Sequence, residues 1–305
     1  MGKKDLKKKS GQVRRVDQKS ITEIELQPRS HILNTEPQSS TIDPQLVDAA
    51  GNIIQKDIKL LDNTKENKRL CVYVPMTWPF TYTKFFENFL KIIHPKHMLM
   101  LREFGITDYY THIEKKFPIC RNRNDAVLKA RKNGADYMLF LDGDMNHPQE
   151  IAYMLMRHQY PICGGVYHHQ SPPHLPVLYF ENLDNPKLYT HNWNYPRDRL
   201  FSVDMTGLGC LLVDLRVFDD MELPYFGYES TREDGLIDVS EDVLFCRQAK
   251  KVGHTIMIDP TVKCTHYALG EVSGMMFDVY MEKYRTYEEV IKKFDIDGTA
   301  KHIMD

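Results

Sequence analysis

The chain changes texture at about residue 66, where short apolar runs begin to alternate with amphipathic segments. The apolar runs are short enough to be strands buried on both faces, and several are flanked by Pro or Gly. We predict strands at Leu70–Val74, His97–Leu101, Tyr137–Leu141, Ile162–Tyr167, Cys210–Val213 and His254–Asp259. The segments with helical spacing predict helices at Tyr82–Ile93, Asp125–Asn133, Pro148–His158, Ser240–Val252 and Val279–Phe294.

Local signals mark the ends of these helices. Asn124 and Ser240 stand where N-caps are expected, and Gly134 and Gly253 stand where helices end. Pro148 suits the first position of a helix. One apolar face is predicted for the first helix, with Phe85, Phe86, Phe89, Leu90 and Ile93 on it. No periodic pattern is visible in 172–193, which we expect to be a long loop.

Strands that alternate with helices indicate an α/β fold, in which a mostly parallel central sheet is covered by helices on both faces. In such sheets ligands bind at the carboxyl ends of the strands. The polar residues of interest below follow predicted strands or open a predicted helix, so we expect them at that edge.

The segment before residue 67 is polar and irregular, with a short helix expected only near Ile53–Leu61. Its first 20 residues contain eight Lys or Arg and two Asp, whereas the whole chain has a net charge of -2. Such a composition buries too little apolar surface to offset the entropy of ordering. We therefore predict a flexible basic tail at 1–66, a globular domain at 67–275 and a C-terminal helical extension at 276–305. The tail is either a solvated segment or a contact for nucleic acid or an anionic surface.

Cysteine usage and hydropathy indicate a cytoplasmic protein. The six cysteines are widely spaced, without a CxxC pair, and most lie in apolar runs. They are interpreted as buried thiols in a reducing compartment. No apolar run approaches the ~20 residues that a membrane-spanning helix needs, and no apolar stretch follows the basic N-terminus to make a secretory signal. We expect no transmembrane segment.

The sharpest candidate for chemistry is Asp142-Gly143-Asp144, directly after the apolar run YMLFL. Two carboxylates beside one glycine at a strand end can converge on a hard divalent cation. The glycine would let a diphosphate approach the backbone. The alternative is an ordinary Asp-Gly turn.

Two further acidic and imidazole candidates lie far along the chain. Glu241 and Asp242 open a predicted helix, where acids also occur simply because they favour the helix dipole. His266 follows the last strand and could join the metal site if the fold returns it to Asp142 and Asp144. A mixed carboxylate and imidazole set suits Mn²⁺ better than Ca²⁺.

Weaker signals surround these. Gly207 and Gly209 permit a tight backbone near a substrate but match no phosphate-loop pattern. The Arg121–Asn124 stretch suits an anionic ligand at a helix start or is a polar loop. His168, His169 and His174 match no zinc spacing, and sugar or acceptor contacts by their loop are favoured. Trp193 and Tyr195 either stack on a sugar or pack internally.

The order of these features resembles glycosyltransferases of the GT-A fold, in particular the inverting family 2 group, over residues 69–270. The resemblance is carried by five motifs in the family's order. They are VPMT (74–77), RNRNDAVLKARKNGADYMLFLDGD (121–144), TGLGCLLVDLRVF (206–218), SEDVLFCRQAKKVGHTIMID (240–259) and His266. The loop GGVYHHQSPPHLP (164–176) departs from the family pattern and leaves the acceptor open.

The resemblance implies a role for each matching residue. The nucleotide-sugar site would contain Pro75, Thr77, Arg123, Asn124, Asp142, Gly143, Gly207 and Gly209. Asp142, Asp144 and His266 would hold Mn²⁺ or Mg²⁺. Asp242 would be the general base, with Glu241 as its rival. The implied enzyme is a hexosyltransferase-like glycosyltransferase that moves one sugar from a nucleotide-diphosphate sugar, most simply a UDP-sugar, to a hydroxyl with inversion.

Three alternatives stay open. If Glu241 and Asp242 only bind acceptor, the enzyme could be retaining. A nucleotidyltransferase could share the sheet and the acidic site, although no Gly-rich, Lys-containing triphosphate loop is found near Pro75. A carbohydrate- or nucleic-acid-binding module without turnover would explain the basic tail. The acceptor, whether glycan, protein or nucleic acid, and the oligomeric state are not determined by the sequence.

Overall fold

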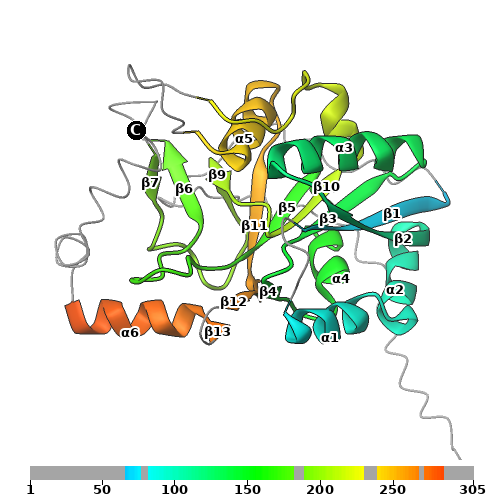
Figure 1. The fold of residues 1–305 in the computed structure, drawn as a ribbon. Helices are drawn as coiled ribbons and strands as arrows, with labels where there is room; N and C mark the ends of the chain where they lie inside the picture. Colours follow the sequence, from blue (N-terminus) through cyan, green and yellow to red (C-terminus); the bar gives the residue numbers. More distant parts are fainter. Residues whose placement is uncertain (1–65, 77–81, 182–188, 230–238, 268–270, 285–305) are drawn as a thin grey trace, which may run out of the picture. The chain divides into compact units, whose positions relative to one another are not determined.

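The computed structural model describes residues 66–76, 82–181, 189–229, 239–267 and 271–284 (Figure 1). The predicted basic tail, the short helix near Ile53–Leu61 and the end of the predicted C-terminal helix lie outside these ranges. Among the described helices, none has both the length and the apolar character needed to cross a membrane.

A seven-stranded sheet organises the described domain, in the order β2-β1-β3-β10-β5-β11-β8. Its strands are β1 (Lys68–Met76), β2 (Ile106–Lys115), β3 (Tyr137–Leu141), β5 (Ile162–Val166), β8 (Phe201–Val203), β10 (Cys210–Asp214) and β11 (Ile256–Lys263). β1 is parallel to β2 and β3, and β5 is parallel to β11. β10 runs antiparallel between β3 and β5, and β8 runs antiparallel to β11. Five strands therefore share one direction, which confirms the predicted mostly parallel sheet.

Helices cover both faces of this sheet (Figure 1). On one face lie α1 (Thr83–Ile92), α2 (Pro95–Met100) and α4 (Ile151–Met156), and on the other lie α3 (Ile119–Lys132), the 3-10 helix η2 (Leu215–Asp219) and α5 (Glu241–Lys251). β3 shows why its sequence is apolar throughout. Its Met138 and Phe140 pack with the α3 and α5 core, while Leu139 and Leu141 pack with the α1 and α4 core.

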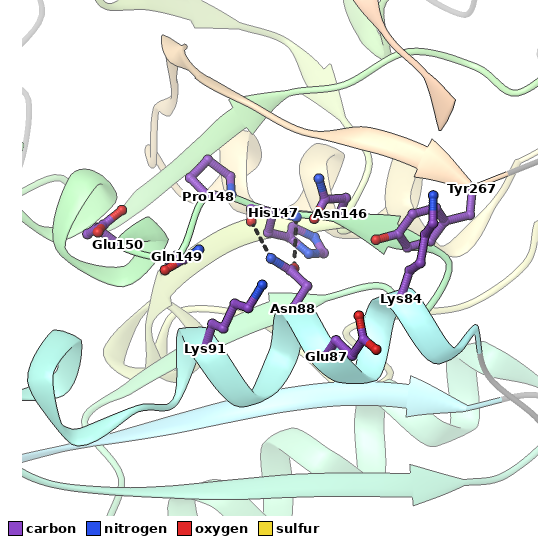
Figure 2. Close-up of a pocket in the computed structure, with 10 residues that line it drawn as sticks. All are labelled: Lys84, Glu87, Asn88, Lys91, Asn146, His147, Pro148, Gln149, Glu150 and Tyr267. Atoms are coloured by element: carbon purple, nitrogen blue, oxygen red, sulfur yellow. Dashed lines mark hydrogen bonds between the residues drawn. The ribbon is translucent and has the colours of Figure 1, made fainter. Parts of the chain in front are cut away.

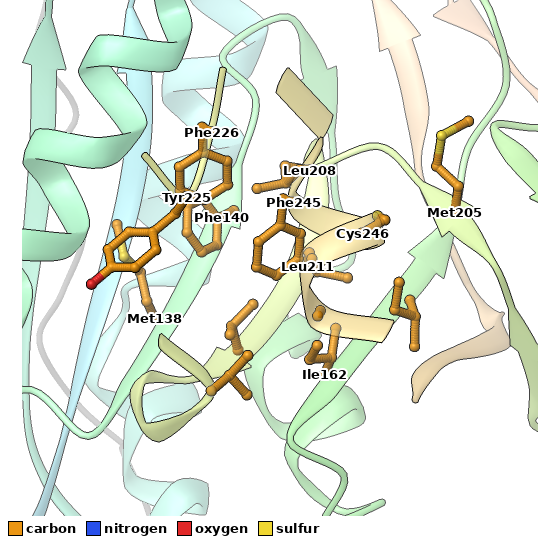
Figure 3. Packing of buried hydrophobic residues seen from close by; sticks show 14 of the residues in the cluster. Met138, Phe140, Ile162, Met205, Leu208, Leu211, Tyr225, Phe226, Phe245 and Cys246 are labelled. Atoms are coloured by element: carbon orange, nitrogen blue, oxygen red, sulfur yellow. The ribbon is translucent and has the colours of Figure 1, made fainter. Parts of the chain in front are cut away.

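Aromatic rings fill the core beneath α5 (Figure 3). Phe226 and Phe245 stack with their centroids 5.3 Å apart, and Phe218 lies 5.7 Å from Phe245. Phe140 of β3 packs against Phe226 at 6.0 Å. These contacts fix the start of α5 over the carboxyl end of β3, which places two of the predicted acidic motifs near each other.

Two small sheets complete the described part, and they correct the expected long loop at 172–193. β6 (Leu178–Glu181) and β7 (Tyr189–His191), from that segment, pair with each other, and β6 also pairs with β9 (Met205–Thr206). The second sheet joins β4 (Met145–Asn146), β12 (Thr265–Tyr267) and β13 (Glu271–Val272). α6 (Gly274–Tyr284) follows and begins five residues before the predicted helix.

The predicted strand at 97–101 is wrong, because this segment is helical. Pro95 occupies the first turn of α2, and the ring of His94 accepts a hydrogen bond from the Lys96 N–H at 3.2 Å. A 3-10 helix, η1 (Leu101–Phe104), continues it. Met98 and Leu101, three residues apart, are buried while Leu99 and Met100 are exposed. A short apolar run does not distinguish a strand from a buried helix, and the helical signal here is Pro95.

The predicted start of α3 is also wrong. The helix begins at Ile119 behind Pro118, so Asn124 lies inside it and is not its cap. On α1 the predicted apolar face is only half buried. Phe85 and Phe89 are in the core, but Phe86 and Leu90 are each 49% exposed.

Other boundaries differ from the expected ones by smaller amounts. Strand β2, at the edge of the sheet, was not expected from the sequence. β11 begins later and runs on to Lys263, and α4 begins at Ile151, three residues after Pro148. All six cysteines are free thiols, and five of them are buried, which agrees with their interpretation as buried thiols.

Candidate functional site

The buried guanidinium of Arg123 is the centre of the site. Arg123 lies on α3 and is 2% exposed. Its Nη1 donates to Glu241 Oε1 at 2.6 Å and to Asp242 Oδ1, and its Nη2 lies 3.3 Å from Asp142 Oδ1. The first predicted acidic motif and the second therefore meet on one arginine, although they lie about a hundred residues apart in the sequence.

The local folds explain how these groups converge. Asp142 is the first residue after β3, and its N–H donates to the Gly209 carbonyl at 3.1 Å. Glu241 and Asp242 form the first turn of α5 behind Ser240, the residue predicted as the cap. The Ser240 side chain makes no capping hydrogen bond, and the two acids occupy the first turn of the helix. Asp142 and Asp242 each expose 26% of their side chains, and Glu241 exposes 10%.

The charges around Arg123 do not balance, since three carboxylates face one guanidinium. Burial and the neighbouring Asp242 raise the pKa of Glu241 to about 7, against the effect of Arg123. Burial also raises the pKa of Asp142 and of Asp242, again with Arg123 opposing the shift. Burial disfavours the charged Arg123, but the three carboxylates outweigh it and raise its pKa. Around pH 7 the Glu241 carboxyl is therefore partly protonated, and in its protonated form it hydrogen-bonds to Asp242.

Asp144 and His266 are brought together by the small sheet of β4 and β12. In its register His266 pairs with Met145, and the Tyr267 N–H donates to the Asp144 carbonyl at 2.7 Å. The ring Nδ1 of His266 lies 2.5 Å from the His168 carbonyl, which leaves Nε2 for other partners. The Asp144 carboxylate accepts a hydrogen bond from Gln170 at 3.0 Å. Within the described residues, no three His, Cys, Asp or Glu side chains converge closely enough to form a metal site.

Gly207 and Gly209 pack against the acidic residues in a turn that leaves no space for side chains. A Cβ at Gly207 would lie 3.1 Å from Asp242 Oδ2, and a Cβ at Gly209 would lie 3.0 Å from Asp142 Oδ2. His147 supports the turn from below, with its Nε2 2.9 Å from the Gly209 carbonyl. These glycines therefore let the backbone approach the carboxylates themselves.

The remaining predicted nucleotide-site residues are placed differently. Pro75 is buried on β1 opposite Glu114, and Thr77 lies outside the described residues. Gly143 is half-buried in the turn after β3. Asn124 connects α3 to a neighbouring loop, since its Oδ1 accepts from the Tyr225 N–H at 2.8 Å and its Nδ2 donates to the Phe226 carbonyl at 2.6 Å.

Two further residues complete the site, Tyr167 from the predicted strand at 162–167 and Asn122 from the predicted Arg121–Asn124 stretch, and neither was assigned a role of its own. Tyr167 follows β5 and is 5% exposed, with its hydroxyl at the glycine turn. Asn122 accepts from the Tyr73 hydroxyl at 2.8 Å and donates to the Glu114 carbonyl, which ties the start of α3 to β1 and β2. The only sequence signal for either was its proximity to a noted motif.

The predicted histidine cluster is part of the core. His168 and His174 are 3% and 4% exposed. His169 Nε2 lies 2.6 Å from the Tyr179 hydroxyl, and its ring packs against His191 with centroids 5.5 Å apart. Tyr195 is also buried, and it stacks on Phe201 at 5.7 Å.

Acid should destabilise the protein through these buried imidazoles. Burial lowers the pKa of His169 to about 3 and of His191 to about 4, from 6.5. Their neutral forms stabilise the fold above pH 6.5, and this contribution is lost as pH falls from 6.5 toward 4. Two such groups make the protein about 2–3 kcal/mol less stable at pH 5.5 than at pH 7.5. Urea unfolding at both values measures the difference.

His191→Gln should remove part of this pH dependence, whereas His94→Gln, at an exposed position, should retain it. A pH dependence of the unfolding free energy that is as large in His191→Gln as in wild type would contradict the prediction.

A polar cavity of about 610 Å³ lies beside the Asp142–Asp144 turn, between α1 and the segment after β4 (Figure 2). Lys84, Glu87 and Lys91 of α1 line one side, and Asn146 and Glu150 belong to the other. Asn88 closes its floor, since its side chain exchanges hydrogen bonds with the His147 backbone at 2.8 and 3.0 Å. Tyr267, next to His266, also lines the cavity and connects it to the candidate metal ligands.

Comparison of the sequence with known protein families and with characterised proteins finds no match. Solved structures align with this chain only at a distance. A197 from STIV aligns with a TM-score of 0.41 and 16% identity, over 66% of this chain and 86% of A197. GalNAc-T7, crystallised with UDP, GalNAc and Mn²⁺, aligns with a TM-score of 0.43 and 9% identity, over 72% of this chain and 48% of its own.

Drosophila β1,4-galactosyltransferase 7, in complex with xylobiose, gives a TM-score of 0.33 and 17% identity, over 63% of this chain and 64% of its own. A putative glucose-1-phosphate thymidylyltransferase from Bacillus anthracis gives a TM-score of 0.36 and 14% identity, over 69% of this chain and 94% of its own. Similarity at this level assigns no activity to the chain, so the function must be argued from the site.

Proposed function

We propose that the chain is a metal-dependent glycosyltransferase that moves one sugar from a nucleotide-diphosphate sugar to an acceptor hydroxyl, with inversion. The observation that carries the proposal is the meeting of Asp142 with Glu241 and Asp242 on buried Arg123. Buried acids around one arginine are costly to the fold. They lie partly exposed at the carboxyl end of β3, and this is the edge at which an α/β sheet binds its ligand.

The candidate metal ligands are Asp142, Asp144 and His266. Their carboxylate and imidazole donors fit Mn²⁺ or Mg²⁺ by chemistry, and the pairing of β4 with β12 supports the closeness of the last two. A bound ion would neutralise the departing diphosphate as a Lewis acid. One oxygen of Asp142 already contacts Arg123, so in this arrangement Asp142 has its second oxygen to offer.

Asp242 is assigned as the general base that accepts the proton of the acceptor hydroxyl. It is more exposed than Glu241, and an acceptor must reach the base within hydrogen-bond distance. Arg123 and the protonated Glu241 orient its carboxylate. Attack from the side of Asp242, opposite the leaving group, gives inversion at the anomeric carbon, with a transition state of oxocarbenium character.

The first test is donor turnover by the purified full chain with UDP-, GDP- and TDP-sugars and Mn²⁺. Release of nucleoside diphosphate is expected from one donor, and EDTA should abolish it. Asp144→Ala should lower the release at least about 100-fold, since a metal ligand is lost. Asp198→Ala, at an exposed aspartate on the surface, is the matched control and should behave as wild type.

The outcomes separate the functions. Pyrophosphate release from a nucleoside triphosphate would indicate a nucleotidyltransferase instead. If no donor were turned over and calorimetry detected no binding of any UDP-, GDP- or TDP-sugar with Mn²⁺, the glycosyltransferase proposal would be abandoned.

A further inference from the structure

Tyr167 occupies the centre of the turn that separates the two acidic motifs. It follows β5, and its ring packs edge-on against His266 with centroids 5.3 Å apart and planes at 76°. Its hydroxyl oxygen accepts a hydrogen bond from the Gly209 N–H at 3.3 Å. A single buried phenol thus touches the glycine turn and a candidate metal ligand.

The shape of the turn depends on this phenol. A Cβ at Gly207 would lie 1.9 Å from the Tyr167 hydroxyl oxygen, far inside contact distance. A Cβ at Gly209 would lie 3.3 Å from the ring carbon that carries the hydroxyl. The hydroxyl therefore fills the space that a side chain at 207 would need, and glycine at this position is explained by Tyr167 without any substrate.

The same turn holds both acids. The Gly209 carbonyl accepts the Asp142 N–H at 3.1 Å, and the Leu208 backbone hydrogen-bonds to the Asp242 carboxylate. The Cβ position that Gly207 lacks lies 3.1 Å from Asp242 Oδ2 as well as 1.9 Å from the Tyr167 oxygen. A shift of the turn would therefore move Asp142 and Asp242 together.

The hydroxyl stays protonated. Burial, with Asp242 and Asp142 nearby, raises the pKa of Tyr167 well above its ordinary value. Because its oxygen accepts from Gly209, its own proton remains for an acceptor. The negative groups near the Tyr167 hydroxyl are the carboxylates of Asp142 and Asp242, and the nearby cation is Arg123. The ring of His266 packs against the Tyr167 ring.

We propose that Tyr167 is a positioning residue for the transfer reaction, which sets Asp242 and Asp142 through the turn at 207–209 that its hydroxyl contacts. This inference rests on the proposed function. It differs from a packing role in one respect, namely that loss of the hydroxyl should lower kcat while the donor KM is retained.

Tyr167→Phe tests it on the full chain with Mn²⁺ and the donor found above. We expect kcat to fall about tenfold, which is about 1.4 kcal/mol in the barrier, with the donor KM within about twofold because the phenyl ring stays in place. Tyr225→Phe, which removes a buried hydroxyl that accepts from Arg131 at 3.2 Å, is the control and should change neither quantity.

A second readout needs no substrate. Gly207→Ala should lower the melting temperature strongly in wild type and by at most half as much in Tyr167→Phe, where the clashing oxygen is gone.

An unchanged kcat in Tyr167→Phe or equal melting losses in both backgrounds would overturn the proposal. If wild type showed no turnover, the proposed function would fail, while the melting comparison would still decide whether Tyr167 governs the turn.

Discussion

Replacing Arg123 by methionine is expected to destabilise the protein by about 3–5 kcal/mol at pH 8, because it leaves buried carboxylates without their cation. The loss should be smaller at pH 5. The pKa values of Asp142, Glu241 and Asp242 are already raised by burial, so these groups can take up protons there and lose their charge. Urea unfolding of wild type and variant at the two pH values measures both effects.

The control for this prediction is Arg131→Met on the same helix. Arg131 pairs with Asp219 at the surface, with 36% of its side chain exposed, and such pairs contribute at most about 1 kcal/mol. A cost for Arg123→Met that matched the control, or that was equal at pH 5 and pH 8, would show that the three acids do not depend on this guanidinium.

The Arg123 cluster also shows where sequence interpretation reached its limit. β3 and the position of Asp142 behind it could be predicted, because a buried strand leaves a local apolar signature. The start of α5 at Glu241 could be predicted from the helical spacing of its apolar residues and from Ser240 at the cap position. Their meeting on Arg123 joins residues 118 and 119 positions apart, and no local pattern reports such a contact.

The wrong elements have physical reasons as well. β2 is an edge strand whose side chains are mostly exposed or half-buried, so it carries no apolar run. The helix α2 is short, and the run HMLML at 97–101 is equally compatible with a strand. In 172–193, β6 and β7 have four and three residues, and they are held by pairing with each other and with β9.

The glycines at 207 and 209 illustrate a different limit. Their presence could be read from the sequence as a tight backbone near a ligand, which is the general use of glycine in a site. In the fold their missing side chains are replaced by the Tyr167 hydroxyl, Met145 and the carboxylates of Asp142 and Asp242. Glycine is needed at 207 because of its contact with Tyr167, which lies 40 residues away in the sequence.

Asp242→Asn is expected to lower kcat about 10²–10⁴-fold, the usual contribution of a general base. Asparagine is nearly isosteric and its carbonyl oxygen can still accept from Arg123, so the donor KM should stay within about threefold. Glu241→Gln is the matched comparison. Because Glu241 already holds its proton up to about pH 7, an amide there imitates the neutral acid, and the loss of kcat should be about tenfold or less.

The two variants should also differ in stability. An ionised Glu241 is disfavoured in the fold, so its raised pKa costs stability progressively as pH rises from about 4.5 through about 7. Glu241→Gln should therefore be at least as stable as wild type at pH 8. Normal turnover by Asp242→Asn would remove Asp242 as the base. If Glu241→Gln then proved the inactive variant, the base would be Glu241, and the proton it keeps near neutral pH would set the acid limb of the activity profile.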